Sequence, residues 1–115
     1  MVSLTLPFPV SVNRLWRGGQ RRIYKSREYN LWLYEAGNKL VEQKPAKIVG
    51  NYELTVWLYP PDKRRRDLDN YFKCISDLLE HHNVIENDWM CRELSAIWMG
   101  IDKEHPRAEV GIIQK

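Results

Sequence analysis

Residues 52–79 constrain the fold more than any other part of the chain. Four apolar residues recur at every second position, the pattern of a strand with one buried face: Tyr52, Leu54, Val56 and Leu58. Pro60-Pro61 ends the strand, because proline cannot donate the backbone hydrogen bond that a sheet needs. Apolar residues then recur at helical spacing, at Leu68, Tyr71, Phe72, Ile75 and Leu79. A strand, a polar loop and a helix are therefore predicted in succession.

The other segments complete one α+β domain over residues 1–115. Ser26 is a good N-cap for a helix that ends near Gln43. Proline, glycine and basic residues predict a loop before it, and residues 83–88 predict a turn. Strands are expected over residues 2–8, 93–101 and 109–114. The order β-α-β-α-β-β predicts one mixed, mostly antiparallel sheet with two helices.

Composition excludes several classes of protein. The chain is 43% hydrophobic with five Trp and six Tyr, which favours a folded globular protein over a disordered one. No run approaches the roughly 18 apolar residues of a membrane helix, and no signal peptide is expected at the start. Cys74 and Cys91 have no metal-ligand spacing with any histidine, so we expect reduced thiols in the cytoplasm.

The loop before the second helix carries the most informative run of charges. Residues 63–70 read Lys-Arg-Arg-Arg-Asp-Leu-Asp-Asn. The four cations attract a polyanion, whereas Asp67 and Asp69 repel it unless a divalent metal lies between them and the polyanion. Mg²⁺ takes oxygen ligands and is usually held by one or two carboxylates together with phosphate oxygens. The run therefore predicts a metal-dependent nuclease.

Basic residues are also concentrated near the start of the chain. The net charge is only +3, yet no acid precedes Glu28, and six cations do: Arg14, Arg17, Arg21, Arg22, Lys25 and Arg27. From Asp77 onward acids outnumber Lys and Arg. This asymmetry predicts one face for an anionic partner. A solvated basic loop explains the charge equally well.

Three carboxylates and a lysine form the candidate site. On a helix that begins at Asp67, Asp69 and Lys73 stand four residues apart and share a face. Asp67 as the N-cap turns its carboxylate toward the same place, where free N–H groups favour a phosphate. Asp88, in the turn after the helix, is the best third carboxylate. Glu86 and Asp77 are the competing choices for that role.

Each of these residues also has a structural explanation. Asp67 could be a cap only, Asp69 and Lys73 an ordinary surface pair, and Asp88 a turn residue. The arginine run could be a solvated stretch. Three aromatic residues could stack on bases of an opened junction, although core packing is expected for the last of them: Trp16, Tyr24 and Trp89.

The chain resembles the RusA-type Holliday junction resolvases in two blocks and one turn. The first block is Leu6-Pro7-Phe8-Pro9 followed by Ser11, Asn13 and Arg14. The second is Arg64-Arg65-Arg66-Asp67-Leu68-Asp69-Asn70 followed by Lys73. Ile85-Glu86-Asn87-Asp88 resembles the turn where the family carries a pair of acids. Asn87 departs from that pair, and Val10 replaces a proline of the opening pattern.

The resemblance implies a small homodimeric enzyme that cuts four-way DNA junctions with Mg²⁺ or Mn²⁺. Such enzymes are often encoded by phages and prophages, and they act in the cytoplasm of a bacterial or phage-infected cell. By position, Asp67, Asp69 and Asp88 correspond to the metal-binding acids, and Lys73 to the catalytic lysine. The departure at Asn87 leaves the number of metals open.

The predicted activity is phosphodiester hydrolysis by paired nicks in opposed strands of a junction. The expected DNA-binding residues come from both basic segments: Arg14, Arg17, Arg21, Arg22, Lys25, Lys63, Arg64, Arg65, Arg66 and Asn70. Two other functions stay open. One is a divalent-metal nuclease for other branched DNA, and the other is a non-catalytic protein that binds junctions.

Overall fold

Strand β4 (Tyr52–Tyr59) lies inside a four-stranded sheet, as its alternating pattern predicts. The structure is a computed structural model and describes residues 1–19 and 22–115. In the sheet order β1-β6-β4-β5, strands β1 (Val2–Pro7) and β6 (Arg107–Gln114) pair antiparallel, as do β6 and β4. β5 (Cys91–Trp98) runs parallel to β4. The predicted α+β domain with a mixed sheet is therefore confirmed.

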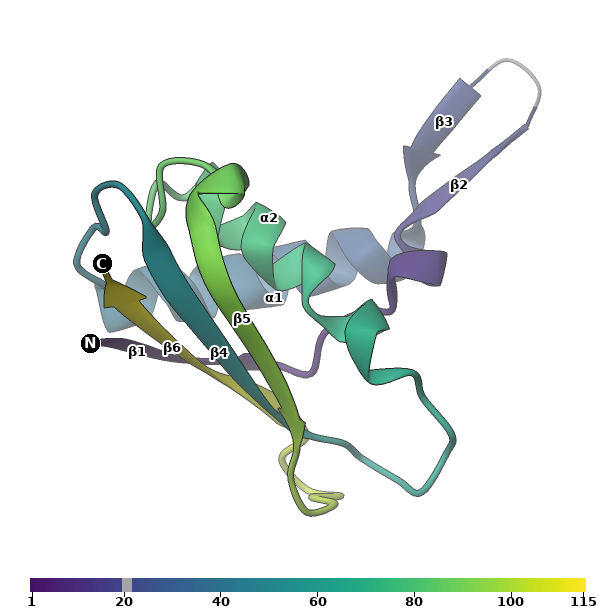
Figure 1. Ribbon diagram of the computed structural model, residues 1–115. Coiled ribbons are helices and arrows are strands. Elements are labelled where there is room, and N and C mark those ends of the chain that lie inside the picture. Colours follow the sequence, from purple (N-terminus) through teal and green to yellow (C-terminus); the bar gives the residue numbers. More distant parts are fainter. Residues whose placement is uncertain (20–21) are drawn as a thin grey trace.

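Two helices cover one face of this sheet (Figure 1). Helix α1 (Arg27–Gln43) begins as predicted, because the Ser26 hydroxyl accepts a hydrogen bond of 3.0 Å from the Tyr29 N–H. It ends at Lys44, which takes the left-handed conformation common after helices. Helix α2 (Lys73–His81) connects β4 to β5 as a crossover between parallel strands.

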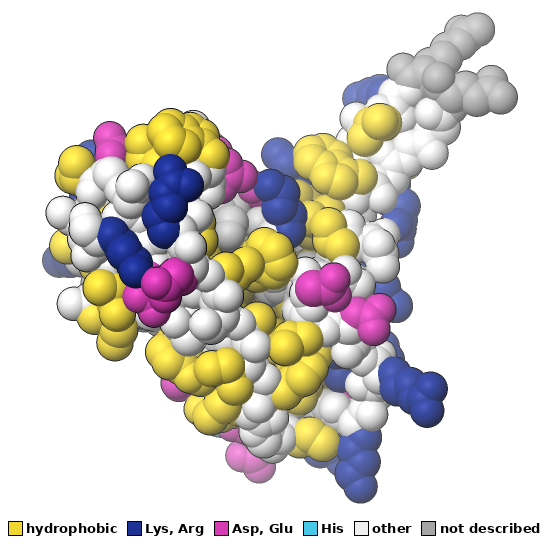
Figure 2. Space-filling view, viewed as in Figure 1, with side chains coloured by type: hydrophobic (Ala, Val, Ile, Leu, Met, Phe, Trp, Pro, Cys, Tyr) yellow, Lys and Arg dark blue, Asp and Glu magenta, His cyan; other side chains and the backbone are white. Residues whose placement is uncertain are grey.

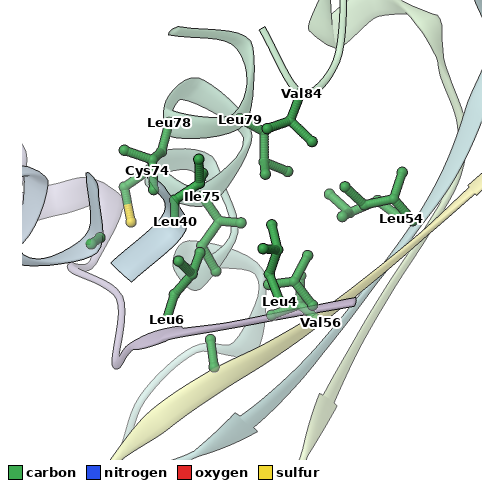
Figure 3. Packing of buried hydrophobic residues seen from close by; sticks show 14 of the residues in the cluster. Leu4, Leu6, Leu40, Leu54, Val56, Cys74, Ile75, Leu78, Leu79 and Val84 are labelled. Carbon is green, nitrogen blue, oxygen red and sulfur yellow. The ribbon is translucent and has the colours of Figure 1, made fainter. Parts of the chain in front are cut away.

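The helices and the sheet share one hydrophobic core (Figure 3). The inward residues of β4 meet apolar side chains of α2, of which Cys74, Ile75 and Leu79 have no exposed surface. Burial raises the pKa of the Cys74 thiol to about 12, and both cysteines are free. No helix in residues 1–19 and 22–115 is long and apolar enough to span a membrane.

The prediction of a continuous loop between the first strand and α1 was wrong. A 3₁₀ turn, η1 (Val12–Arg14), is followed by a hairpin of β2 (Trp16–Gly19) and β3 (Arg22–Lys25). Gly18 permits the pairing, because a side chain there would collide with the carbonyl oxygen of Arg22. The hairpin projects from the body of the protein (Figure 1).

The prediction that the second helix begins at Asp67 was also wrong. Asp67 has extended backbone angles and makes no capping hydrogen bond with its side chain. A 3₁₀ turn, η2 (Leu68–Tyr71), comes next, and the α-helix begins only at Lys73. Residues three apart share a side in both kinds of helix, so the apolar spacing did not distinguish them.

The last strands and one aromatic residue also differ from expectation. Strand β5 begins and ends two to three residues earlier than predicted, and β6 begins two residues earlier. Trp89 was expected in the core, but 62% of it is exposed. It lies in the 3₁₀ turn η3 (Asp88–Met90), where the Arg92 guanidinium is 6.0 Å from its ring centre.

We predict that Leu54→Ala destabilises the protein by about 2–5 kcal/mol, because it opens a cavity under the central strand. Leu54 is only 1% exposed. The matched control is Leu31→Ala on α1, where the leucine is 55% exposed and the expected change is below about 0.5 kcal/mol. Urea unfolding measures both, and equal losses would contradict this description of the core.

Candidate active site

Asp67 and Asp69 flank an open depression beside the edge of the sheet. Both residues are exposed, and they line the depression, of about 430 Å³, with Leu68, Phe72, Leu94 and Ala96. Neither carboxylate has a hydrogen bond or ion pair within residues 1–19 and 22–115. Two uncompensated carboxylates, two residues apart, therefore face solvent at the end of the basic loop.

Lys73 and Asp88 meet although fifteen residues separate them. Lys73 is the first residue of α2 and Asp88 the first of η3. The Lys73 ammonium lies 3.4 Å from Asp88 Oδ2 and 3.1 Å from Asp77 Oδ1. Hydrogen bonding to Asp77 is the largest cause that raises the pKa of Lys73, and Asp88 adds to it. The lysine is therefore a firmly protonated cation between two carboxylates.

The backbone of Asp88 is fixed by two other elements. Its N–H donates a 2.9 Å hydrogen bond to Glu80 Oε1, on the last turn of α2. The buried Tyr52 hydroxyl, at the start of β4, lies 3.5 Å from the Asp88 carbonyl oxygen. Burial raises the pKa of Tyr52, so this hydroxyl stays protonated. Asp88 thus sits where α2 and the central strand meet.

Asp69 and Lys73 do not share a helix face as predicted, because the α-helix begins only at Lys73. The alternative of an ordinary surface pair between them is not seen either. Of the competing third carboxylates, Asp77 joins Lys73, whereas Glu86 accepts a hydrogen bond from the Gly50 N–H. Asn87, the departure from the family pattern, caps η3 through its side-chain oxygen.

The donor set fits a hard divalent cation in its chemistry. Carboxylate oxygens are the ligands that Mg²⁺ prefers, and Asp67 and Asp69 have no competing cation in the described chain. Asp88 is different, because Lys73 partly neutralises it. Among residues 1–19 and 22–115, no three acidic, histidine or cysteine side chains lie close enough to hold a metal as they stand. A shared site would require side-chain movement at Asp88.

A groove joins the two sequence blocks behind the resemblance. It encloses about 690 Å³, and its walls come from residues 7–14, from α1 and from the basic loop. Its basic and polar lining includes Arg14, Arg64, Arg65, Arg66 and Asn70, all predicted DNA contacts. The acids Glu28 and Glu35 also line it. The groove leads along the basic loop to Asp67.

Arg66 differs from its neighbours in this loop. Its side chain is only 9% exposed and makes a 2.9 Å ion pair with Asp62. Its guanidinium also lies 5.4 Å from the centre of the Phe8 ring. Arg64 keeps 66% of its side chain exposed, and Arg65 is exposed as well. Arg66 therefore shapes the loop, while Arg64 and Arg65 face solvent.

Of the other predicted DNA contacts, Lys63 is exposed in the basic loop, and the rest of the described ones belong to the hairpin β2–β3. Arg17, Arg22 and Lys25 are exposed, and Arg21 lies outside the described residues. Trp16 and Tyr24 are each about half exposed, at 51% and 52%. Figure 2 shows Lys and Arg side chains beside the hairpin and around the β4–η2 loop, with acidic side chains on the same face.

The sequence reasoning did not assign two of the residues that organise this site. Asp77 was considered only as an alternative metal ligand, and Glu80 was not considered. Their spacing from Lys73 offered a signal for Asp77 alone, because residues four apart on a helix are neighbours. The contact of Glu80 with Asp88 depends on the turn that follows α2, which spacing does not predict.

Comparison with known proteins identifies the family. The model of the family described as "Endodeoxyribonuclease RusA" matches residues 7–113. A crossover junction endodeoxyribonuclease RusA from Aquifex aeolicus is 31% identical over 112 residues, which is 96% of this chain and 83% of that protein. The protein of the same name from Enterobacteria phage HK97 is 32% identical, over 72% of this chain and 70% of its own length. The one from Escherichia coli K12 is 33% identical, over 67% and 65%.

The family match over residues 7–113 includes Asp67, Asp69, Lys73 and Asp88, the groove, and all of both sequence blocks except Leu6. The chain therefore belongs to the RusA family of endodeoxyribonucleases, enzymes that hydrolyse phosphodiester bonds within DNA.

Proposed function

We propose that this protein resolves Holliday junctions by paired, symmetric hydrolysis of two phosphodiester bonds, with Mg²⁺ as its cofactor and Mn²⁺ as an alternative. The observation that carries the proposal is that carboxylates, a lysine and a basic loop lie in one connection between strands. The exposed Asp67 and Asp69 adjoin the basic loop, and Lys73 contacts Asp88 on the neighbouring turn. The relatives named above are crossover junction enzymes, which supports a four-way junction as the substrate.

Asp67, Asp69 and Asp88 would hold the metal. When bound, Mg²⁺ polarises the scissile phosphate and lowers the pKa of the attacking water. The ammonium of Lys73, which contacts Asp88, would stabilise negative charge that develops on the phosphate. Its raised pKa keeps the cation in place throughout the neutral range.

The basic loop and the hairpin hold the DNA backbone. Arg64 and Arg65 project into solvent beside the groove, and Arg17 and Lys25 do so on the hairpin. Such contacts to phosphates bind without regard to sequence and weaken as salt rises. The half-exposed Trp16 and Tyr24 are placed among these cations, where they can stack on bases of an opened junction.

Paired cleavage requires two sites, and we propose that two copies of the chain supply them. β5 is one of the two edge strands of the sheet, and no strand of the described chain pairs with its outer side. It exposes Leu94, Ile97 and Trp98 by 43%, 39% and 36%. Unpaired backbone with apolar side chains is a ready template for another strand. A second β5 fits best, because a twofold pair of strands matches the approximate twofold symmetry of the junction.

The test is incubation of the protein with a labelled four-way junction and with a linear duplex of the same sequence. We expect paired nicks in the junction with Mg²⁺ and none with EDTA. Asp69→Asn should abolish cleavage and leave junction binding equal or tighter, because it removes a charge that repels phosphate. Binding without cleavage by the unaltered protein, over several metals and sequences, would favour the non-catalytic alternative. Equal cutting of other branched DNA would favour the broader nuclease.

Arg65→Ala and Arg66→Ala should separate DNA contact from loop structure. We expect Arg65→Ala to weaken junction binding and reduce the slope of log affinity against log salt by about one, with no change in thermal unfolding. Arg66→Ala should lower the midpoint of thermal unfolding, because it removes the ion pair with Asp62 and the contact with Phe8. The reverse pattern would show that Arg66 is the free DNA contact.

Ile97→Lys should convert the proposed dimer to a monomer, because a charge on an edge strand opposes pairing with another strand. Light scattering after size-exclusion chromatography measures the mass. The matched control is Val41→Lys, at a valine on α1 that is 59% exposed, and it should leave the dimer intact. A monomeric unaltered protein, or a dimer that survives Ile97→Lys, would contradict the assigned interface.

A further inference from the structure

One face of α2 carries Lys73 and two acidic residues, Asp77 and Glu80, that contact the Lys73–Asp88 pair. Lys73, Asp77 and Glu80 follow at intervals of four and three residues, so their side chains lie on neighbouring turns. Asp77 and Glu80 are partly exposed. Asp77 contacts Lys73, and Glu80 contacts Asp88; both partners belong to the proposed active site.

Asp77 is the nearer of the two carboxylates at the Lys73 ammonium, at 3.1 Å against 3.4 Å for Asp88. The Asp77 pair lies within one helix, so it does not depend on the position of the turn η3. Any ligand that draws the Asp88 carboxylate toward itself leaves Lys73 held by Asp77. Without Asp77, a flexible four-carbon side chain would then lose its orientation.

Glu80 acts on the backbone of Asp88. The first N–H groups of a helical turn have no partner within the turn. Glu80 Oε1 accepts a hydrogen bond of 2.9 Å from one of them, the Asp88 N–H. Glu80 is the penultimate residue of α2, and the chain between His82 and Asp88 is irregular. The hydrogen bond therefore ties the start of η3 directly to the helix that carries Lys73.

We propose that Asp77 and Glu80 are positioning residues for strand cleavage. Asp77 orients the Lys73 ammonium, and Glu80 fixes the backbone from which the Asp88 carboxylate projects. Neither residue is assigned a contact with DNA or metal. The proposal rests on the proposed function for the roles of Lys73 and Asp88. The contacts of Asp77 with Lys73 and of Glu80 with Asp88 are seen in the structure.

The first experiment measures single-turnover cleavage of a saturating four-way junction by Asp77→Asn. Loss of groups that orient ligating or reacting residues typically costs roughly 10- to 100-fold, so we expect a fall of that size in rate with unchanged junction affinity. Because Asp77 acts through Lys73, adding Asp77→Asn to Lys73→Ala should slow cleavage no further. Full additivity of the two changes would overturn the proposal.

Glu80 is tested with two variants that differ in hydrogen-bonding capacity. Glu80→Gln keeps an oxygen that can accept from the Asp88 N–H, whereas Glu80→Ala does not. We expect Glu80→Gln to cleave at least several-fold faster than Glu80→Ala. Equal rates would exclude the backbone contact as the cause. Thermal unfolding of each variant separates a positioning effect from loss of the fold.

A readout that needs neither metal nor activity separates this proposal from the proposed function. In the metal-free protein, ¹⁵N relaxation reports the order of the Lys73 ammonium, which should fall in Asp77→Asn. The control is Glu42→Gln, which removes an exposed ion pair with Lys39 on α1 and should change neither Lys73 order nor cleavage. If the unaltered protein cuts no junction but Lys73 order depends on Asp77, only the proposed function fails. Unchanged order in Asp77→Asn would overturn the positioning role.

Discussion

The parallel pairing of β4 with β5 is the constraint on which the rest of this structure depends. Two parallel strands cannot be joined by a tight turn, so the chain must cross from one end of the sheet to the other. The crossing segment contains the basic loop, η2, α2 and η3 in succession. Every proposed catalytic residue lies in this one connection, from Asp67 to Asp88. The helix packs on the core, and the groups at its two ends are thereby held in place.

That arrangement explains how charges of opposite sign share one region. The basic loop leaves the end of β4 and is pinned by Arg66, whose ion pair and contact with Phe8 leave the neighbouring arginines in solvent. The carboxylates follow within one to three residues. Under the proposed function, DNA that binds the cations would lie against acids that repel it unless a metal is bound.

The sequence predicted the elements whose signals are local. Ser26 marked the start of α1 because its hydroxyl caps the helix, and the apolar alternation marked β4 because one face is buried. The hairpin β2–β3 was missed because Gly18-Gly19 indicates a turn, whereas here the glycines belong to a strand. The start of α2 was misplaced because a 3₁₀ turn continues the apolar spacing. Asp88 was assigned to the site from its turn and from the family resemblance, but its contact with Lys73 was not predicted. The contacts of Asp77 and Glu80 with this pair likewise form only when the crossover folds.

The position of Lys73 itself argues for a role in chemistry. The N-terminus of a helix carries a partial positive charge, so a cation at its first position is unfavourable and an acid would stabilise it. Here the lysine is retained and two carboxylates, Asp77 and Asp88, surround it. Replacing Lys73 would leave Asp77 and Asp88 without their shared cation, so the two ion pairs offset the unfavourable position of the lysine on the helix. An ammonium at this end of the helix, on the same connection as the basic loop, is suited to a phosphate that approaches from that loop.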